Sequence, residues 1–201
     1  MRILHISDTH GYHRQLTNLP DADVVVHSGD FTKNGTEKEV LDFLNWFIPL
    51  PYKNKIFVGG NHDECLFGAD FEGLPDDTHY LCGSGITFTG ILFFGIPMFM
   101  SLFETTANGN RYDEMIKQIP SETDVLITHQ PPLGILDSTD TNYWGDSGLF
   151  RKIKSVQPKL HLFGHVHNAY GTSKIGQTLF SNASIVDEKY EIVNAPRLLS
   201  L

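Results

Sequence analysis

The stretch LHLFGHVHN at residues 160–168 joins a short apolar run to two histidines, His165 and His167, that lie two positions apart. Side chains at positions i and i+2 of an extended chain lie on one face, so both imidazoles are expected to reach the same spot beyond the end of a strand. Such a pair, placed directly after a buried strand, favours a metal site. Further ligands are then expected at the ends of neighbouring strands.

Four other apolar runs end in the same way. The residues that follow the runs RILHIS, DVVVHS, KIFVG and DVLIT are Asp8 and His10; Asp30; Asn61, His62 and Asp63; and His129. Taken singly, each group also fits a turn, a helix cap or a partly buried side chain. Ligands in layered α/β folds bind beyond the carboxyl ends of the strands, so the five ends are expected to converge. Carboxylates and imidazoles gathered without a compensating charge would be unfavourable, so the set predicts a bound cation.

The chemistry of this set indicates two metal ions. Oxygen and imidazole ligands without thiolate suit Mn, Fe or Zn rather than a structural zinc finger. The candidates exceed what one tetrahedral ion uses, and two divalent ions that share a carboxylate fit them better. These candidates are Asp8, His10, Asp30, Asn61, His129, His165 and His167. Two such ions would leave net positive charge in a cleft of an acidic protein, and that charge attracts an anion.

Length and composition indicate a single domain spanning residues 1–201. The 201 residues, 40% of them hydrophobic, suffice for one substantial core, and no repeat or linker divides the chain. The net charge of −9 disfavours stable nucleic-acid binding through a basic surface. No apolar run is long enough for a membrane span, no secretory leader is evident, and Cys65 and Cys82 lie outside any CxxC motif. We therefore expect a cytoplasmic protein.

Strand and helix patterns alternate along most of the chain, which is typical of a layered α/β fold. Helical spacing is present at residues 36–50, 110–118 and 147–156, with Thr36 and Ser147 as expected N-caps of the first and third. The expected apolar stripe of the first helix is Val40, Leu41, Leu44, Phe47 and Ile48. Between Leu81 and Pro97 strands follow one another through glycines, which indicates hairpins and a mixed sheet.

The ordered set D-x-H, G-D, G-N-H-D, H and G-H-x-H, from Asp8 to His167, resembles the motif blocks of the calcineurin-like metallophosphoesterase family. The stretches THQPPLG, PKLHLFGHVH, AYGT and SNAS are similar to its small branch, the metallophosphoesterase domain-containing proteins, whose characterised members hydrolyse phosphodiesters including cyclic nucleotides. The resemblance implies a layered α/β/β/α sandwich with two mixed β-sheets. It also implies hydrolysis of a small phosphorylated substrate by in-line attack of a metal-bridging hydroxide.

The resemblance further implies a role for each matched residue. One metal would be held by Asp8, His10 and His167, the other by Asn61, His129 and His165, and Asp30 would bridge them. Asn61 and His62 would contact the phosphate, and His62 would protonate the leaving oxygen as general acid. Asp63 would orient the His62 ring or raise its pKa.

Other residues are expected near this site from their position alone. His13 follows the first motif, and Arg111 ends the loop at residues 97–113, so either could contact a phosphate. The phenylalanines of that loop are expected in the core or in a dimer contact, which leaves a homo-oligomer open. The turn-rich segment 137–148, with Tyr143 and Trp144, is expected to form a lip of the cleft.

Polar residues inside or beside the strands are expected to support the site. His5, His27 and His161 each lie within an apolar strand, where a hydrogen-bonded core position is more common than metal ligation. Asn182 in SNAS is expected to support the metal loops from a neighbouring strand.

Two departures from the family pattern narrow the range of activities that we expect. Lys33 stands in GDFTKNG where protein Ser/Thr phosphatases of the family have an aspartate, which argues against a protein phosphatase. His165 is present where some members of the small branch have glycine, so a fully loaded two-metal site is expected. The same ligands are also compatible with a phosphomonoesterase or a nuclease of the same superfamily. A protein-interaction scaffold on this fold would be expected to have lost ligands, and none is missing from the sequence.

Overall fold

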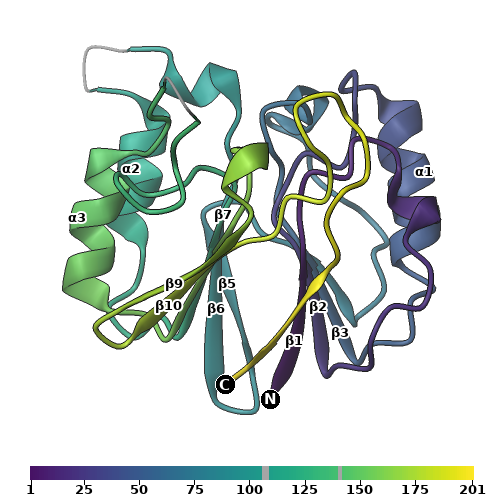
Figure 1. Cartoon of the computed structure of the whole chain (residues 1–201), viewed down its shortest axis with the longest axis horizontal. Coiled ribbons are helices and arrows are strands. Elements are labelled where there is room, and N and C mark those ends of the chain that lie inside the picture. Colours follow the sequence, from purple (N-terminus) through teal and green to yellow (C-terminus); the bar gives the residue numbers. More distant parts are fainter. Residues whose placement is uncertain (106–108, 140–141) are drawn as a thin grey trace.

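Two mixed sheets lie face to face, with helices against the outer side of each (Figure 1). The computed structural model describes residues 1–105, 109–139 and 142–201. The first sheet has the order β11-β1-β2-β3-β4 and consists of β1 (Arg2–Ile6), β2 (Val24–His27), β3 (Asn54–Phe57), β4 (Thr78–Tyr80) and β11 (Arg197–Ser200). The second has the order β5-β6-β7-β8-β10-β9 and consists of β5 (Ser84–Phe88), β6 (Ile91–Ile96), β7 (Val125–Thr128), β8 (Leu160–Phe163), β9 (Gly171–Ile175) and β10 (Thr178–Asn182). The predicted layered α/β/β/α sandwich is confirmed.

Strand pairing is parallel in the centre of each sheet and mostly antiparallel at the edges. In the first sheet β1 to β4 run parallel, and β11 is antiparallel to β1. In the second, β6, β7, β8 and β10 run parallel, and the edge strands β5 and β9 pair antiparallel with their neighbours. The β5–β6 hairpin is the one expected between Leu81 and Pro97. Because the central strands are parallel, their carboxyl ends lie together at one edge of each sheet.

An apolar core between the sheets comes from alternate residues of the central strands. Its buried members include Ile3, Val24, Val26, Ile56, Phe93, Val125, Ile127, Leu160 and Leu162. The intervening side chains, such as Leu4, Val25 and Leu126, face outward and pack in the core that contains the helices. Both faces of each sheet are therefore buried, which explains why these strands read as continuous apolar runs.

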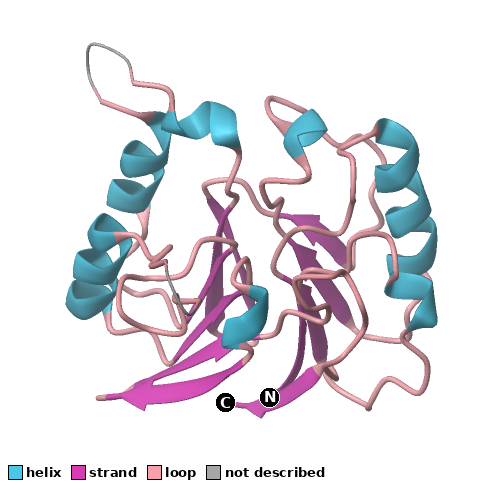
Figure 2. Cartoon of the chain, turned by 45° about the horizontal axis from the view of Figure 1, so that its top comes forward, coloured by secondary structure: helices cyan, strands magenta, loops and turns pink. Residues whose placement is uncertain are grey.

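Helices α1 (Glu37–Phe47), α2 (Arg111–Gln118) and α3 (Ser147–Val156) form the outer layers, with α1 on one side and α2 and α3 on the other (Figures 1 and 2). The described part of the chain also has single-turn 3-10 helices at His13–Gln15, Glu64–Leu66, Met100–Phe103 and His167–Ala169. Among the described residues, none of the helices is both long and apolar enough to cross a bilayer.

The structure confirms the predicted N-cap of α1 and corrects the predicted N-cap of α3. Thr36 caps α1 as predicted, in a capping box with Glu39. The buried stripe of α1 is Val40, Phe43, Leu44 and Phe47, spaced i, i+3, i+4 and i+7. Including Leu41 in the stripe was wrong, because it lies one position out of this phase and is 60% exposed. At α3 the cap is Asp146, one residue before Ser147.

Candidate functional site

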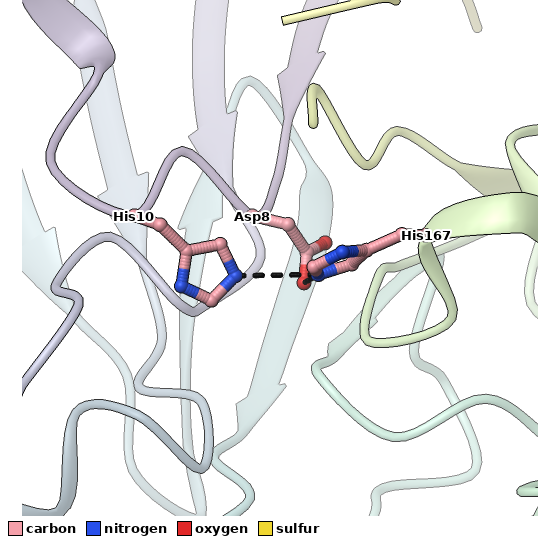
Figure 3. Close-up of side chains that lie close together, drawn as sticks. All are labelled: Asp8, His10 and His167. Atoms are coloured by element: carbon pink, nitrogen blue, oxygen red, sulfur yellow. Dashed lines mark hydrogen bonds and ion pairs between the residues drawn. The ribbon is translucent and has the colours of Figure 1, made fainter. Parts of the chain in front are cut away.

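Side chains from several strand ends meet where the carboxyl edges of the two sheets face each other. Asp8 and His10 follow β1, Asp30 follows β2, His129 follows β7 and His167 follows β8. His10 Nε2 lies 3.2 Å from His167 Nε2, which lies 3.5 Å from Asp8 Oδ1 (Figure 3). On the other side of Asp8, His129 Nε2 lies 3.4 Å from Asp30 Oδ2 and 3.9 Å from Asp8 Oδ1. Five of the seven predicted ligands therefore form two adjoining groups that share Asp8, and His62 lies in a third group with His10 and Asp30.

The backbone at the ligands is held in an unfavourable conformation. Asp8, His10, Asp30 and His165 have φ angles of 52°, 41°, 56° and 69°, in the left-handed region that L-residues seldom adopt. Such residues persist where the surrounding structure determines them, and they cluster at functional sites. The chain therefore turns sharply at these four residues, which follow β1, β2 and β8.

Glycines in the motifs allow the ligand loops to approach each other closely. A Cβ on Gly164 would overlap Asp8 Oδ2 and Ser7 Oγ. A Cβ on Gly60 would overlap Asp30 Oδ1. The glycines of G-H-x-H and G-N-H-D are thus required because a carboxylate from the neighbouring loop occupies the place of their side chain.

Backbone carbonyls set the orientation of four site histidines. His10 Nδ1 lies 3.1 Å from Thr32 O, His62 Nδ1 2.9 Å from Lys33 O, His129 Nδ1 2.9 Å from Ser28 O, and His167 Nδ1 3.0 Å from Asp187 O. A carbonyl only accepts, so Nδ1 carries the proton in each case. The Nε2 atom of each neutral ring is then free to act as a metal ligand.

Positive charge between the ligands would stabilise the buried carboxylates of the site. Burial lowers the pKa of His129, but the Asp30 and Asp8 carboxylates outweigh burial and raise it to about 9. Burial raises the pKa of Asp30, but His129 and His10 outweigh burial and hold it well below its usual range. A proton on His129 therefore balances these carboxylates in the absence of a metal. Divalent cations would balance them more fully.

The donor set fits two divalent metals. Among the described residues, two buried atoms of the site have no hydrogen-bond partner: His129 Nε2 and Asn61 Oδ1. Burial lowers the pKa of His10 and of His165 to about 4 in each case, so both rings are neutral and have a lone pair to donate. The His165 ring centroid lies 5.2 Å from that of His129, on the side of the centre assigned by resemblance to the second metal.

His62 lies at the rim of the centre, and Asp63 does not contact its ring. The His62 ring centroid is 4.7 Å from that of His10, and the ring is held by the Lys33 carbonyl. The carboxylate of Asp63 turns inward instead, where it accepts hydrogen bonds from the backbone N–H groups of Asp30, Thr32 and Gly60. The predicted Asp63–His62 contact is therefore absent from the described structure, because those three buried N–H groups occupy the carboxylate.

Residues near the C-terminus hold Asp8 in place through hydrogen bonds, as expected for Asn182. Asn182 Nδ2 donates to the Val166 carbonyl, and Asn182 Oδ1 accepts from the Ser184 backbone N–H. The Ser184 hydroxyl donates to Asp8 Oδ2 at 2.7 Å. The backbone of Ser7 is paired with this segment, since Ser7 N–H donates to Ala183 and Ser7 O accepts from Ile185. Asp8 is thus fixed by residues more than 170 positions away.

The three strand histidines lie in the core, as predicted. His5 lies 2.9 Å from both Ser181 Oγ and Ser28 Oγ, and so connects the two sheets. His27 contacts the Thr9 hydroxyl, and His161 contacts the Thr128 hydroxyl. All three are fully buried, so they support the loops rather than bind a ligand.

Two predicted substrate contacts are not brought to the cluster. His13 is 1% exposed, with Nε2 3.2 Å from Asp42 and its ring against Trp46, so it is closed to a substrate. Arg111 is exposed and lies over the Phe67 ring, 5.5 Å from its centroid, and no contact among the described residues joins it to the cluster. His13 is paired instead with Asp42, and Arg111 with the Phe67 ring.

The phenylalanines of the loop at 97–113 pack against the core, as expected. Phe99 is 1% exposed, and Phe103 stacks on Tyr112. Residues 106–108 of this loop, and residues 140–141 of the predicted lip at 137–148, lie outside the described part of the chain. Within the described part of that lip, the Trp144 ring lies 5.7 Å from the His165 ring.

Tyr190 is a site residue that the sequence patterns did not indicate. Its ring centroid lies 4.9 Å from that of His10, 5.8 Å from that of His167 and 6.4 Å from that of His62. It belongs to a turn after the last motif, where no strand end or ligand pattern marks it. The proximity of this turn to His167, through the Asp187 carbonyl, arises from the tertiary fold.

Comparisons with known proteins agree with this geometry. The family model for calcineurin-like phosphoesterases matches residues 1–169. A UPF0046 protein of Caenorhabditis elegans is 34% identical over 220 residues, which cover 98% of this chain and 73% of the relative. Metallophosphoesterase domain-containing protein 1 of Homo sapiens is 32% identical over 232 residues, covering 100% of this chain and 71% of the relative. The crystal structure of TT1561 of Thermus thermophilus superposes with a TM-score of 0.64 at 14% identity, covering 92% of this chain and 90% of that one, and shows the shared fold.

Proposed function

Since the chain belongs to the calcineurin-like phosphoesterase family, a family of metal-dependent phosphoesterases, we propose that it hydrolyses small phosphodiesters, with cyclic nucleotides as a candidate class. The observation that carries the proposal is the meeting of Asp8, His10, Asp30, His129 and His167, with each ring's Nδ1 bound to a carbonyl and its Nε2 turned to the shared space. The preference for diesters rests on the resemblance of the stretches around the motifs to the small branch.

The proposed ligand sets follow the family resemblance, and one of them, Asp8 with His10 and His167, is also a group in the structure. Asp8, His10 and His167 would hold one ion, Asn61, His129 and His165 the other, with Asp30 between them. When bound, two divalent ions supply charge that orients the phosphoryl group and lowers the pKa of a water molecule. Manganese, iron and zinc all suit this donor set.

His62 would act as the proton donor. Its Nδ1 is held by the Lys33 carbonyl, so in the protonated ring Nε2 carries the transferable proton. The backbone N–H of His62 donates to Asp30 Oδ1 at 2.8 Å, which fixes the ring at the rim beside the proposed bridging carboxylate. Asn61 and His62 would then contact the phosphate, and Nε2–H would protonate the departing oxygen.

The test is the hydrolysis of bis(p-nitrophenyl) phosphate by chelator-treated protein before and after addition of Mn²⁺. We expect turnover to depend on the metal and to fall by about 10²- to 10⁴-fold in His62→Ala, the usual contribution of general acid catalysis. Elemental analysis should find two ions per chain in the wild type and in the variant. This separates loss of the proton donor from loss of metal.

Two outcomes would contradict the proposal. Turnover of p-nitrophenyl phosphate without turnover of the diester would show a phosphomonoesterase. A protein that binds two ions and hydrolyses neither ester would be a scaffold on the same fold.

A further inference from the structure

A cleft of about 240 Å³ lies beside the candidate metal centre, and two aromatic side chains line it. Its lining includes Trp144, His165, Val166, His167 and Tyr190. Because His165 and His167 are proposed metal ligands, a group held in this cleft would be next to the phosphate. Pockets that hold a whole drug-sized ligand measure roughly 300–1,000 Å³. This cleft therefore suits one ring system of a larger molecule.

Tyr190 is held rigidly at the edge of this cleft. Its φ angle is 62°, and its backbone N–H donates to the Asp187 carbonyl that also accepts from His167. The Lys33 ammonium lies 5.6 Å from the ring centroid, within the range of a cation–π contact. A side chain already held in place loses little entropy when it binds a ligand.

Trp144 presents an aromatic surface on the side of His165. It is 48% exposed, and its ring meets the His165 ring nearly edge to face, at 86°. The neighbouring Tyr143 is 77% exposed, and in the described structure no ring contact joins it to the cluster. An exposed indole ring and a half-buried phenol ring next to a polar centre are suited to stack with planar groups.

Glu188 also lines the cleft and adds a hydrogen-bond acceptor to it. It is exposed and belongs to the same turn as Tyr190. A carboxylate at this place can accept a hydrogen bond from the ring N–H of guanine, thymine or uracil or from the exocyclic NH₂ of adenine, guanine or cytosine, groups that plain hydrocarbon rings lack.

We propose that Trp144 and Tyr190 form a subsite for the nucleobase of the ester, and that they make the enzyme select nucleoside phosphoesters over alkyl phosphoesters. This inference rests on the proposed phosphodiesterase function and assigns its substrate selectivity to two residues outside the ligand motifs. The two rings bind the non-reacting part of the substrate and position it.

The test compares two esters with the same leaving group, thymidine 5′-(4-nitrophenyl phosphate) and ethyl 4-nitrophenyl phosphate, on Mn²⁺-loaded protein. Their ratio of kcat/KM reports the contribution of the nucleoside. Base stacking on an aromatic side chain is worth about 1–3 kcal/mol. We therefore expect Tyr190→Leu and Trp144→Leu each to lower this ratio about tenfold, mainly through KM of the thymidine ester.

Matched variants separate stacking from other effects. Tyr190→Phe keeps the ring and should keep the ratio. Tyr143→Leu removes a more exposed aromatic residue from the same loop as Trp144 and should also keep the ratio. Leucine at position 190 keeps a non-glycine residue at the left-handed φ angle, so the turn is strained to the same extent as in the wild type.

The failures of the two proposals are distinguishable. If the wild type hydrolyses both esters and neither leucine variant changes the ratio, the subsite is overturned and the phosphodiesterase function stands. If the wild type hydrolyses neither ester with Mn, Fe or Zn, both proposals fall. If a leucine variant loses metal, the test is instead the quenching of Trp144 fluorescence in the wild type by thymidine 5′-monophosphate. Trp144→Leu serves as the blank, because it retains only the fluorescence of Trp46. Absence of quenching overturns the subsite.

Discussion

Asp63 joins the two motif loops that carry Asp30 and Asn61. Its buried carboxylate accepts from the N–H groups of Asp30, Thr32 and Gly60 at 2.8–2.9 Å. An amide turns an NH₂ group toward at least one of these donors, and a buried donor without an acceptor costs about 1–3 kcal/mol. Asp63→Asn should therefore lower the free energy of unfolding by about 2 kcal/mol and weaken metal binding, as measured by urea unfolding and metal titration.

Asp70→Asn is the matched control, since Asp70 is exposed and lies on the segment that follows. It should change the free energy of unfolding by less than about 0.5 kcal/mol. Equal effects of the two substitutions would show that the buried acceptor role of Asp63 is unimportant.

At the scale of single residues, the sequence predicted those parts of the site that local pattern determines. The ligands follow apolar runs directly, so their convergence could be inferred from strand order and the layered fold. Tyr190 and the Lys33 carbonyl could not, because one lies in a turn without a motif and the other acts through its backbone. Asp63 was misassigned because a carboxylate next to a histidine in sequence does not have to face it.

At the scale of elements, the N-terminus of α1 is connected to the proposed proton donor. The Glu39 carboxylate accepts from the backbone N–H groups of Thr36, Asn34 and Lys33, at 3.1–3.3 Å, and the Lys33 carbonyl orients His62. The capping box thus helps to hold the loop whose carbonyl orients His62, the proposed proton donor.

Glu39→Ala should remove this connection and leave these N–H groups to water. We expect a loss of about 1–2 kcal/mol in the free energy of unfolding and a severalfold lower kcat at unchanged metal content. Glu37→Ala removes an acidic residue from the same first turn without touching the loop, and it should leave kcat at the wild-type value. If kcat falls equally in both, the effect comes from helix charge rather than from the His62 loop.

Elements were predicted well where both faces of a strand are buried. The strands missed by pattern include β4, β9 and β11, which are edge strands paired on one side only. The β9 sequence, GTSKI, has no fully buried residue and so carries no apolar run. Such strands form because a neighbour offers free backbone groups, which is a property of the assembled sheet.

At the scale of the whole molecule, buried neutral histidines make the metal-free fold sensitive to acid. Burial lowers the pKa of His5, His27 and His161 to about 3 in each case, against 6.5 in the unfolded chain. Below pH 6.5 the unfolded chain binds protons that the folded chain does not, so stability is lost as the pH falls. Each group contributes a slope of about 1.4 kcal/mol per pH unit between the two values.

His161→Gln tests this, since glutamine keeps an N–H donor for Thr128 and does not titrate. Urea unfolding in the presence of a chelator at pH 7.5, 6.5, 5.5 and 4.5 should show a slope smaller by about 1.4 kcal/mol per pH unit in the variant below pH 6. An unchanged slope would mean that His161 is protonated within the fold.

The pairing of Ser7 and Asp8 with residues 183–185 bears on the order in which parts of the protein fold. Contacts between such distant parts of a chain form late, because a long loop must close before they stabilise anything. We therefore expect the ligand set to be complete only after both sheets have formed, so that metal ions bind the folded protein and do not direct its folding. Metal ions should then slow unfolding and leave the folding rate unchanged, because their contacts with the protein form after the folding transition state.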